Sequence, residues 1–354
     1  MKVVVAIDSF KGSLTSMEAN KAAAEGVRAV YADAEICTAT VSDGGEGYLD
    51  AFNAAIGGDI IDVDIYDPLM RPIKAQYLLK DRLAVIEIAR ACGLTLLRRE
   101  ELEPLKATTY GTGQLIADAV KRGAKHIIVG LGGSATSDAG EGMIRALTDT
   151  FSQDGTWRSI QRLRQVRFTI ASDVANPLCG PDGAAHVFGP QKGATPEMVD
   201  ILEERAQQFS IRSAKLLGYD RSKAAGAGAA GGLGYALMQY LNAECKSGVD
   251  LLLDTMGYDD MAREADYIIT GEGSADFQTL MGKLPMGILH RSGNANVCLI
   301  AGQISERAEL LRAGFARVEC INPPDIIHSE AMRPEIAYSN IRRTVCKIMG
   351  GQAR

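Results

Sequence analysis

The sequence predicts an α/β protein with two domains. Short apolar segments, typical of buried strands, alternate with segments of helical periodicity along most of the 354 residues. Several of the apolar segments run directly into glycines, hydroxyls and carboxylates. The length suits roughly two domains with substantial cores. Because the carboxyl ends of parallel strands meet at one edge of a sheet, we expect these polar loops to assemble a binding site.

The chain opens with a predicted strand at 3–7, a helix over 16–30 and a second strand at 35–41. Residues 60–88 change character and indicate antiparallel strands joined by a turn at 67–72. The later elements are a helix at 115–122 and strands at 127–130, 168–171, 267–270, 297–301 and 318–321. This alternation implies a parallel sheet covered by helices on both faces.

The two ends of the chain are expected to share one domain, because the strand at 297–301 resembles the opening strand. That domain is predicted to comprise 1–70 and 281–354, and to be Rossmann/flavodoxin-like with a parallel sheet. The antiparallel segment then begins an inserted α/β domain, 71–280, with a mixed sheet.

Composition and charge exclude several classes of protein. The net charge is -6, from 38 Lys+Arg and 44 Asp+Glu, and no basic tract stands out, so nucleic acid is not an expected partner. No apolar run approaches the ~18 residues of a membrane span, and the opening run is too brief for a signal sequence. Seven scattered cysteines without C-x-x-C spacing suit reduced thiols. We therefore expect a cytoplasmic protein.

Residues 125–143 carry the strongest functional signal. A predicted apolar strand is followed directly by Gly132, Gly133 and Ser134, with Asp138 a few residues later. Glycines allow the backbone to approach a phosphate closely, and a helix beginning after them would direct its unpaired N–H groups to the same point. The segment therefore predicts an anion-binding turn, although it does not name the nucleotide.

Other nucleotide-binding and catalytic motifs are weaker or absent. There is no G-x-x-x-x-G-K-[ST], no H-R-D with D-F-G and no G-x-S-x-G, so P-loop enzymes, protein kinases and serine hydrolases lack support. Residues 226–231 match G-x-G-x-x-G, but no strand precedes them, which disfavours a dinucleotide fingerprint. A close helix approach or a flexible loop is as good a reading of this segment as a contact with ligand. An NAD-dependent oxidoreductase acting on a small hydroxy acid stays open as an alternative, disfavoured because no acidic residue ends the following strand.

Charged residues at glycines and strand ends match the needs of phosphoryl transfer. Lysines neutralise the oxygens of the transferring group, and carboxylates hold magnesium or accept a proton from the nucleophile. The candidates are Lys11, Lys192 and Lys283 with Asp43, Asp138, Asp173 and Glu272.

Together these blocks resemble the bacterial type I glycerate kinases, in order and over almost the whole chain. The matching blocks are 8–15, 43–47, 107–113, 130–136, Asp173 with 176–180, 188–194, 226–234, and 271–273 with Asp276, Gln278, Thr279, Gly282 and Lys283. The chain departs from the family pattern at Ser274, where an arginine is usual, so substrate choice or rate could differ. A catalytically weakened nucleotide-binding relative is therefore a further alternative.

The resemblance implies ATP-dependent phosphorylation of glycerate with Mg²⁺, with 2-phosphoglycerate as the common product and the active site in the interdomain cleft. Asp173 is the candidate for orienting or deprotonating the acceptor hydroxyl, and Lys11 and Lys192 for stabilising phosphoryl charge. The remaining candidates bind nucleotide or substrate: Gly132, Gly133, Ser134, Asp138, Asn176, Asp276 and Lys283, with Asp43 and Glu272 as ligands of magnesium or substrate. A homo-oligomer is left open.

Overall fold

The computed structural model describes residues 1–42 and 44–351, which form two compact units. The terminal unit contains both ends of the chain, Met1–Asp43 and Val249–Arg354, and the inserted unit is Gly44–Gly248. Each unit has its own sheet and its own buried core. The α/β class with one parallel and one mixed sheet is therefore confirmed.

The terminal unit is built on a parallel sheet of five strands in the order β11-β10-β9-β1-β2. The strands are β1 (Lys2–Ile7), β2 (Glu35–Thr38), β9 (Tyr267–Ala275), β10 (Asn296–Ile304) and β11 (Arg317–Cys320). Renumbered along this sheet, the order is the flavodoxin-like 2-1-3-4-5. The direction of winding reverses between β1 and β9, and such a switch point is where ligands bind in open α/β sheets.

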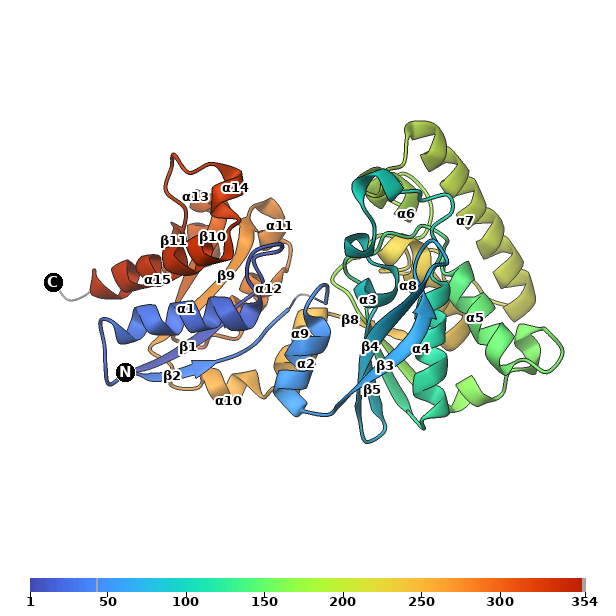
Figure 1. The fold of residues 1–354 in the computed structure, drawn as a ribbon, viewed down its shortest axis with the longest axis horizontal. Coiled ribbons are helices and arrows are strands. Elements are labelled where there is room, and N and C mark those ends of the chain that lie inside the picture. The colour runs from blue at the N-terminus through green and yellow to red at the C-terminus, as the bar shows by residue number, and fades with distance from the viewer. Residues whose placement is uncertain (43, 352–354) are drawn as a thin grey trace. The chain divides into compact units, whose positions relative to one another are not determined.

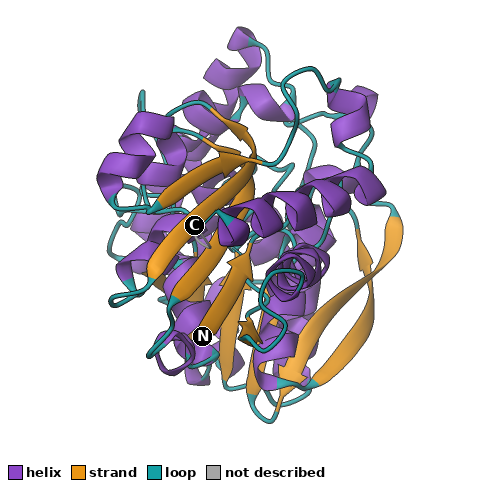
Figure 2. Ribbon diagram, turned by 90° about the vertical axis from the view of Figure 1, so that its left-hand side faces the viewer, coloured by secondary structure: helices purple, strands orange, loops and turns teal. Residues whose placement is uncertain are grey.

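Helices cover both faces of this sheet (Figure 2). On one face α1 (Ser16–Arg28) and α15 (Pro334–Gly350) lie side by side (Figure 1). They can pack closely because Gly26 has no side chain: a Cβ there would lie 2.6 Å from the Arg342 carbonyl oxygen. The other helices of the unit are α9 (Gly248–Thr255), α10 (Tyr258–Ala262), α11 (Phe277–Leu280), α12 (Leu284–His290), α13 (Arg307–Ala313) and α14 (His328–Ala331).

The inserted unit is built on a mixed sheet whose six strands lie in sequence order. They are β3 (Asp59–Tyr66), β4 (Pro72–Lys80), β5 (Leu83–Glu87), β6 (His126–Gly130), β7 (Arg167–Ala171) and β8 (Glu244–Lys246). The first three run antiparallel and the last four, from β5 onward, run parallel. The carboxyl ends of β5 to β8 therefore share one edge, as the sequence predicts.

The helices of the inserted unit connect these strands (Figure 1). They are α2 (Tyr48–Ile56), α3 (Ala89–Cys92), α4 (Tyr110–Lys121), α5 (Glu141–Phe151), α6 (Ala184–Phe188), α7 (Pro196–Leu217) and α8 (Ala229–Leu241). Short 3₁₀ turns are η1 (Leu94–Leu96), η2 (Arg99–Glu101), η3 (Trp157–Ser159), η4 (Arg162–Gln165) and η5 (Pro190–Lys192).

The units divide at 43/44 and 248/249, whereas the sequence placed the boundaries at 70/71 and 280/281. Strand β3 pairs with β4 along its whole length, which brings residues 59–66 into the mixed sheet. Strand β9 pairs with β1 and β10, which brings 267–275 into the parallel sheet. Strand pairing, by the local hairpin of β3 and β4 and by the long-range contacts of β9, thus determines both boundaries.

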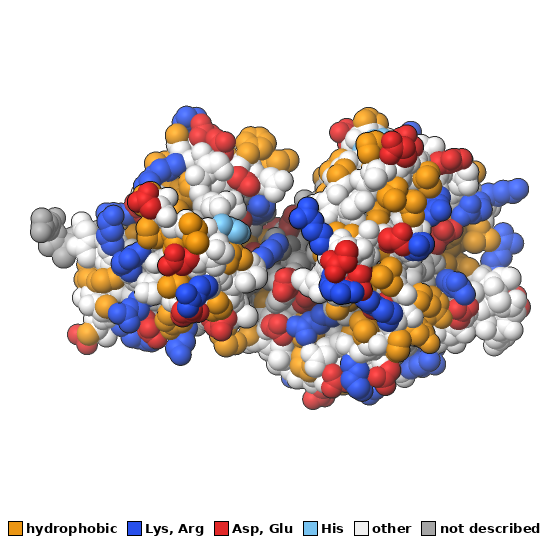
Figure 3. Space-filling view, turned by 45° about the horizontal axis from the view of Figure 1, so that its top comes forward, with side chains coloured by type: hydrophobic (Ala, Val, Ile, Leu, Met, Phe, Trp, Pro, Cys, Tyr) orange, Lys and Arg blue, Asp and Glu red, His pale blue; other side chains and the backbone are white. Residues whose placement is uncertain are grey.

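Acidic and basic side chains are intermixed on the face shown in Figure 3. Within residues 1–42 and 44–351, no helix combines the length and apolar character that crossing a membrane requires.

Candidate functional site

The glycine turn after β6 is held by backbone contacts that only glycine permits. The Gly132 N–H donates to the Gly44 carbonyl oxygen at 3.1 Å, and a Cβ on Gly132 would overlap the Gly45 Cα atom. Gly133 has a φ of +75°, in the left-handed region that favours glycine. The turn is therefore shaped by close packing of the Gly44–Gly45 backbone against Gly132, and exposed Gly133 is the glycine that a ligand can reach.

Beneath this turn lies a buried lysine. Lys192 ends η5 and is 1% exposed, and its Nζ donates to Ser134 Oγ at 2.9 Å and to the Thr136 carbonyl oxygen at 2.6 Å. Burial lowers the pKa of Lys192 to about 8, opposed by the nearby Cys92 and Asp138. Within the described part of the chain no carboxylate lies within ion-pair distance of this ammonium. A positive charge without a counter-ion thus lies directly under the turn.

Asp138 behaves differently, because several donors from the protein surround its carboxylate. It accepts hydrogen bonds from the Thr109 N–H at 2.8 Å and the Thr109 hydroxyl at 2.9 Å. It also accepts from the N–H groups of Gly140 at 3.0 Å and Gly142 at 3.1 Å, where α5 begins. Asp138 therefore fixes the start of α5 to the start of α4, with its oxygens directed to the protein.

Asp173 follows β7 and is exposed at the edge where the parallel strands end. Its charge raises the pKa of Tyr48, whose burial is the larger cause, so the two side chains lie near each other. Asn176, in the same loop, donates from Nδ2 to the Asp182 carbonyl oxygen at 2.8 Å. This hydrogen bond joins two residues of the same loop and so stabilises its shape. The Asp173 carboxylate lies at the same sheet edge as the glycine turn, because β6 and β7 are parallel neighbours.

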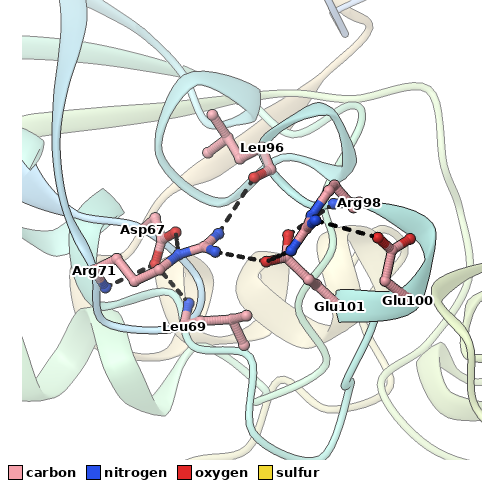
Figure 4. Close-up of polar contacts among 7 residues, drawn as sticks. All are labelled: Asp67, Leu69, Arg71, Leu96, Arg98, Glu100 and Glu101. Atoms are coloured by element: carbon pink, nitrogen blue, oxygen red, sulfur yellow. Dashed lines mark hydrogen bonds and ion pairs between the residues drawn. The ribbon is translucent and has the colours of Figure 1, made fainter.

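The segment after α3 flanks the glycine turn and is fastened at its far end (Figure 4). The Leu94 N–H donates to the Gly133 carbonyl oxygen at 2.8 Å. Arg71 donates to buried Asp67 at 2.6 Å and to Glu101 at 2.8 Å, which joins η2 to the turn between β3 and β4. These ion pairs hold the segment that closes one side of the turn.

A groove of about 490 Å³ is lined in part by Asp138. Its lining comes from residues 104–108, 137–145 and 205–209, and it includes a buried hydroxyl, Ser137 Oγ, that has no hydrogen-bond partner among the described residues. The lining contains neither Ser134 nor Asp173. The groove is therefore separate from the edge where the strands end.

In the terminal unit, two carboxylates lie beside the switch point: Asp8 directly after β1, and Glu272 within β9. Ile7 pairs with Gly271, and the next residues, Asp8 and Glu272, are 6% and 8% exposed. The Asp8 N–H donates to the Gly271 carbonyl oxygen at 2.9 Å. Neighbouring parallel strands thus bring two nearly buried acids to one sheet edge.

Glu272 is supported by a hydroxyl and a lysine. Thr279 Oγ1 donates to its Oε1 at 2.6 Å, and Lys283 Nζ lies 3.6 Å from its Oε2. Lys283 also lies 3.8 Å from Asp276, whose carboxylate caps α11 by accepting from the Gln278 N–H at 2.8 Å. The predicted residues Glu272, Asp276 and Lys283 therefore form one cluster, and Thr279 belongs to it.

Two further residues of the terminal unit are predicted to take part in the site, Lys11 and Asp43. Lys11 is exposed in the turn between β1 and α1. Asp43, a predicted ligand of magnesium or substrate, lies outside the described residues. Among residues 1–42 and 44–351, no group of three or more His, Cys, Asp and Glu side chains is arranged to hold a metal ion.

The glycines at 226–231 serve packing. A Cβ on Gly231 would overlap the Thr136 carbonyl oxygen, and one on Gly228 would overlap the Pro177 carbonyl oxygen. The start of α8 therefore lies against both the glycine turn and the Asp173 loop, which is the close helix approach offered above as one reading.

Sequence reasoning left four residues of these clusters unassigned: Asp8, Thr279, Tyr48 and Glu87. Asp8 follows a strand as Asp173 does, and Glu87 ends β5 beside Gly130, so the strand-end rule could have found both. Buried Glu87 accepts from the Leu49 N–H at 3.1 Å, and burial raises its pKa. Thr279 and Tyr48 carry no such signal, because their roles depend on contacts that only folding creates.

Comparison with known proteins identifies the family. The sequence profile described as "Glycerate kinase family" matches residues 3–351. The chain belongs to the glycerate kinase family. Among relatives, a glycerate kinase of Bacillus subtilis is 42% identical over 327 residues, covering 86% of each chain. A glycerate 2-kinase of Escherichia coli is 36% identical over 370 residues, covering 97% of this chain and 96% of the relative.

A solved structure agrees with this family assignment. The crystal structure of a protein provisionally named glycerate kinase 2, from Salmonella typhimurium LT2, is 35% identical, has a TM-score of 0.82 and covers 100% of this chain and 98% of its own. The family resemblance noted from the sequence is confirmed, as is the prediction that the chain is an enzyme of this kinase family. The oxidoreductase alternative receives no support from these relatives.

Proposed function

We propose that this protein transfers a phosphoryl group from ATP to glycerate. The observation that carries the proposal is the glycine turn with the Lys192 ammonium beneath it, in a chain whose residues 3–351 match the family profile. Phosphoryl transfer is catalysed mainly by positioning and by electrostatic stabilisation of spread negative charge. The glycine turn would supply the positioning, and the buried Lys192 ammonium would supply the electrostatic stabilisation.

In the inserted unit, the turn holds a phosphate and Asp173 handles the acceptor. Exposed Gly133 allows a phosphate to approach the backbone, Gly132 makes room for the Gly44–Gly45 backbone beside the turn, and Ser134 contributes a hydroxyl. Exposed Asp173 orients the acceptor hydroxyl of glycerate and takes its proton as the new P–O bond forms. Asp138 and Asn176 keep the two loops in shape through the hydrogen bonds described above.

In the terminal unit, Glu272, Asp276 and Lys283 bind charged groups of the reactants, and Lys11 neutralises phosphoryl charge. Mg²⁺ prefers oxygen ligands and usually takes one or two carboxylates together with phosphate oxygens and water. Nearly buried Glu272 is a carboxylate of this kind, so it fits such a site without a group of three acids, and Asp43 is its candidate companion. When bound, the ion would neutralise charge on the phosphates.

The proposed product is 2-phosphoglycerate, on the strength of the E. coli relative named glycerate 2-kinase. We also propose that the protein acts in the cytoplasm on a small-molecule substrate, in keeping with seven cysteines that are all free thiols. A homo-oligomer stays a prediction.

The test is a ³¹P NMR spectrum of the reaction of D-glycerate with ATP and Mg²⁺. We expect ADP and a phosphate ester on the secondary carbon. An ester on the primary carbon would refute the proposed position alone, and no ester on glycerate would refute the proposed activity.

A further inference from the structure

Lys192 is unusual in being a fully buried cation whose partners are all neutral. Its side chain is 1% exposed, and its two acceptors are the Ser134 hydroxyl and the Thr136 carbonyl. A buried charge costs several kcal/mol unless it is paired. The groups that act on it electrostatically are the Cys92 thiol from α3 and the Asp138 carboxylate from the turn before α5. Burial raises the pKa of Cys92 to about 11, so this thiol is uncharged at neutral pH.

The Asp138 carboxylate does not neutralise this charge at close range. It is committed to the N–H groups of Thr109, Gly140 and Gly142. Among residues 1–42 and 44–351, no anion therefore contacts the positive charge that Lys192 places under the turn.

The Lys192 contact also determines which way the Ser134 hydroxyl acts. An ammonium can only donate, so Ser134 Oγ accepts a hydrogen bond from Lys192, and the hydroxyl's own hydrogen can be donated elsewhere. Ser134 Oγ donates to no other described group. Ser134 follows directly on exposed Gly133, the residue of the turn that solvent reaches most readily.

We propose that Lys192 is a positioning residue that acts through Ser134. Its ammonium orients the Ser134 hydroxyl toward the glycine turn. Its positive charge attracts an oxyanion of a reactant to that turn. The inference rests on the proposed function in one respect, namely that the oxyanion belongs to ATP or to glycerate. Lys192 itself stays beneath the turn and touches neither reactant. The shared chemistry of the ligand is a phosphate or carboxylate group.

This arrangement predicts that ligand binding takes up protons. The pKa of Lys192 in the free protein is lowered to about 8, and a bound anion would raise it. Above pH 8 part of the free protein has a neutral Lys192, so an oxyanion at the turn draws in a proton and its affinity falls as the pH rises. Near pH 9 the uptake should be a large fraction of one proton per site.

The experiment is calorimetric titration of the full-length protein at pH 9 in two buffers of different ionisation enthalpy. One arm uses ADP and the other D-glycerate, so the arm that shows uptake identifies the source of the oxyanion. Lys192→Arg keeps the charge but does not titrate in this range, and should abolish the uptake. Ser134→Ala should weaken binding by ~10-fold, the effect of one hydrogen bond to a charged group.

Uptake in either arm that disappears in Lys192→Arg supports the inference. Equal heats in both buffers with each ligand, or uptake that persists in Lys192→Arg, would overturn it. If Lys192→Arg does not fold, unchanged binding of both ligands by Ser134→Ala overturns it, and weakened binding supports it. Proton uptake in a protein that does not phosphorylate glycerate would preserve the inference while removing the proposed activity.

Discussion

The two strand-end clusters differ in how their charge is balanced. In the inserted unit, a cation that is 1% exposed has a hydroxyl and a carbonyl as its partners. In the terminal unit, the Glu272 carboxylate is 8% exposed, yet it receives the Thr279 hydroxyl and has Lys283 at 3.6 Å. In the first cluster no described carboxylate contacts the cation, whereas in the second the carboxylate and the lysine lie within ion-pair distance. Removing a side chain should therefore have different consequences in the two units.

The largest expected effect concerns Asp173, the exposed acid at the same sheet edge as the glycine turn. Asp173→Ala should lower kcat by ~10²- to 10⁴-fold, the usual contribution of a general base, with a smaller change in the KM for ATP. The measurement is steady-state ADP release with D-glycerate. Asp182→Asn, in the same exposed loop, is the matched control and should retain activity. Equal turnover in the wild type and Asp173→Ala would remove Asp173 from the mechanism.

Asp138 should matter for stability more than for chemistry. Asp138→Asn places an amide against N–H donors of Thr109, Gly140 and Gly142, and should lower the free energy of unfolding by about 2–4 kcal/mol. Urea denaturation measures this loss. Glu141→Gln, an exposed neighbour at the start of α5, should change stability by less than about 0.5 kcal/mol. If the two variants were equally stable, the hydrogen bonds of Asp138 would not be what stabilises the turn before α5.

In the terminal unit, Glu272→Gln tests a cluster whose charges are already balanced. The amide oxygen can still accept from Thr279, but the attraction for Lys283 is lost. We expect a rise of ~10-fold in the KM for a reactant or in the Mg²⁺ concentration at half-maximal rate, from the loss of one charged contact. Initial rates at varied ATP, glycerate and Mg²⁺ would measure it. Unchanged constants for all three would leave Glu272 a purely structural acid.

The smallest effect concerns His126, a titrating group of the inserted unit that lies outside both clusters. Burial, with Arg167 and Lys246 nearby, lowers its pKa to about 4. The unfolded chain then binds more protons than the folded protein between pH 6.5 and 4, so stability falls as the pH drops through this window. Urea midpoints should decline less steeply there in His126→Gln than in the wild type. Identical slopes would mean that His126 does not contribute.

Much of the fold could be predicted because its causes are local. Apolar runs ending in polar residues marked the strands, and the strand-end rule located Asp173. Glu272 follows the apolar part of β9, although that strand continues to Ala275. The unit boundaries could not be read, because they depend on the pairing of β3 with β4 and of β9 with β1. Each of these pairings joins segments that the predicted boundaries at 70/71 and 280/281 place in different domains.

The site was predicted less fully, because burial of a charge depends on tertiary contacts. Lys192 lies in a Pro-Gln-Lys-Gly segment that reads as a surface turn, yet it is enclosed by residues 134–136 and by α3 far away in the sequence. Asp138 was expected to bind a reactant, but its position between two helix starts directs its oxygens to the backbone. The hydrogen-bond partners of Lys192 and of Asp138 follow no periodicity or fixed spacing in the sequence, so the sequence does not predict them.

The most direct test of the account is a crystal structure of the protein with ADP and D-glycerate bound. The account predicts a phosphate or carboxylate oxygen within hydrogen-bonding distance, about 2.5–3.0 Å, of Ser134 Oγ, with Lys192 still donating to that hydroxyl from below. Bound reactants whose oxyanions all lie away from the turn at 132–134 would contradict it.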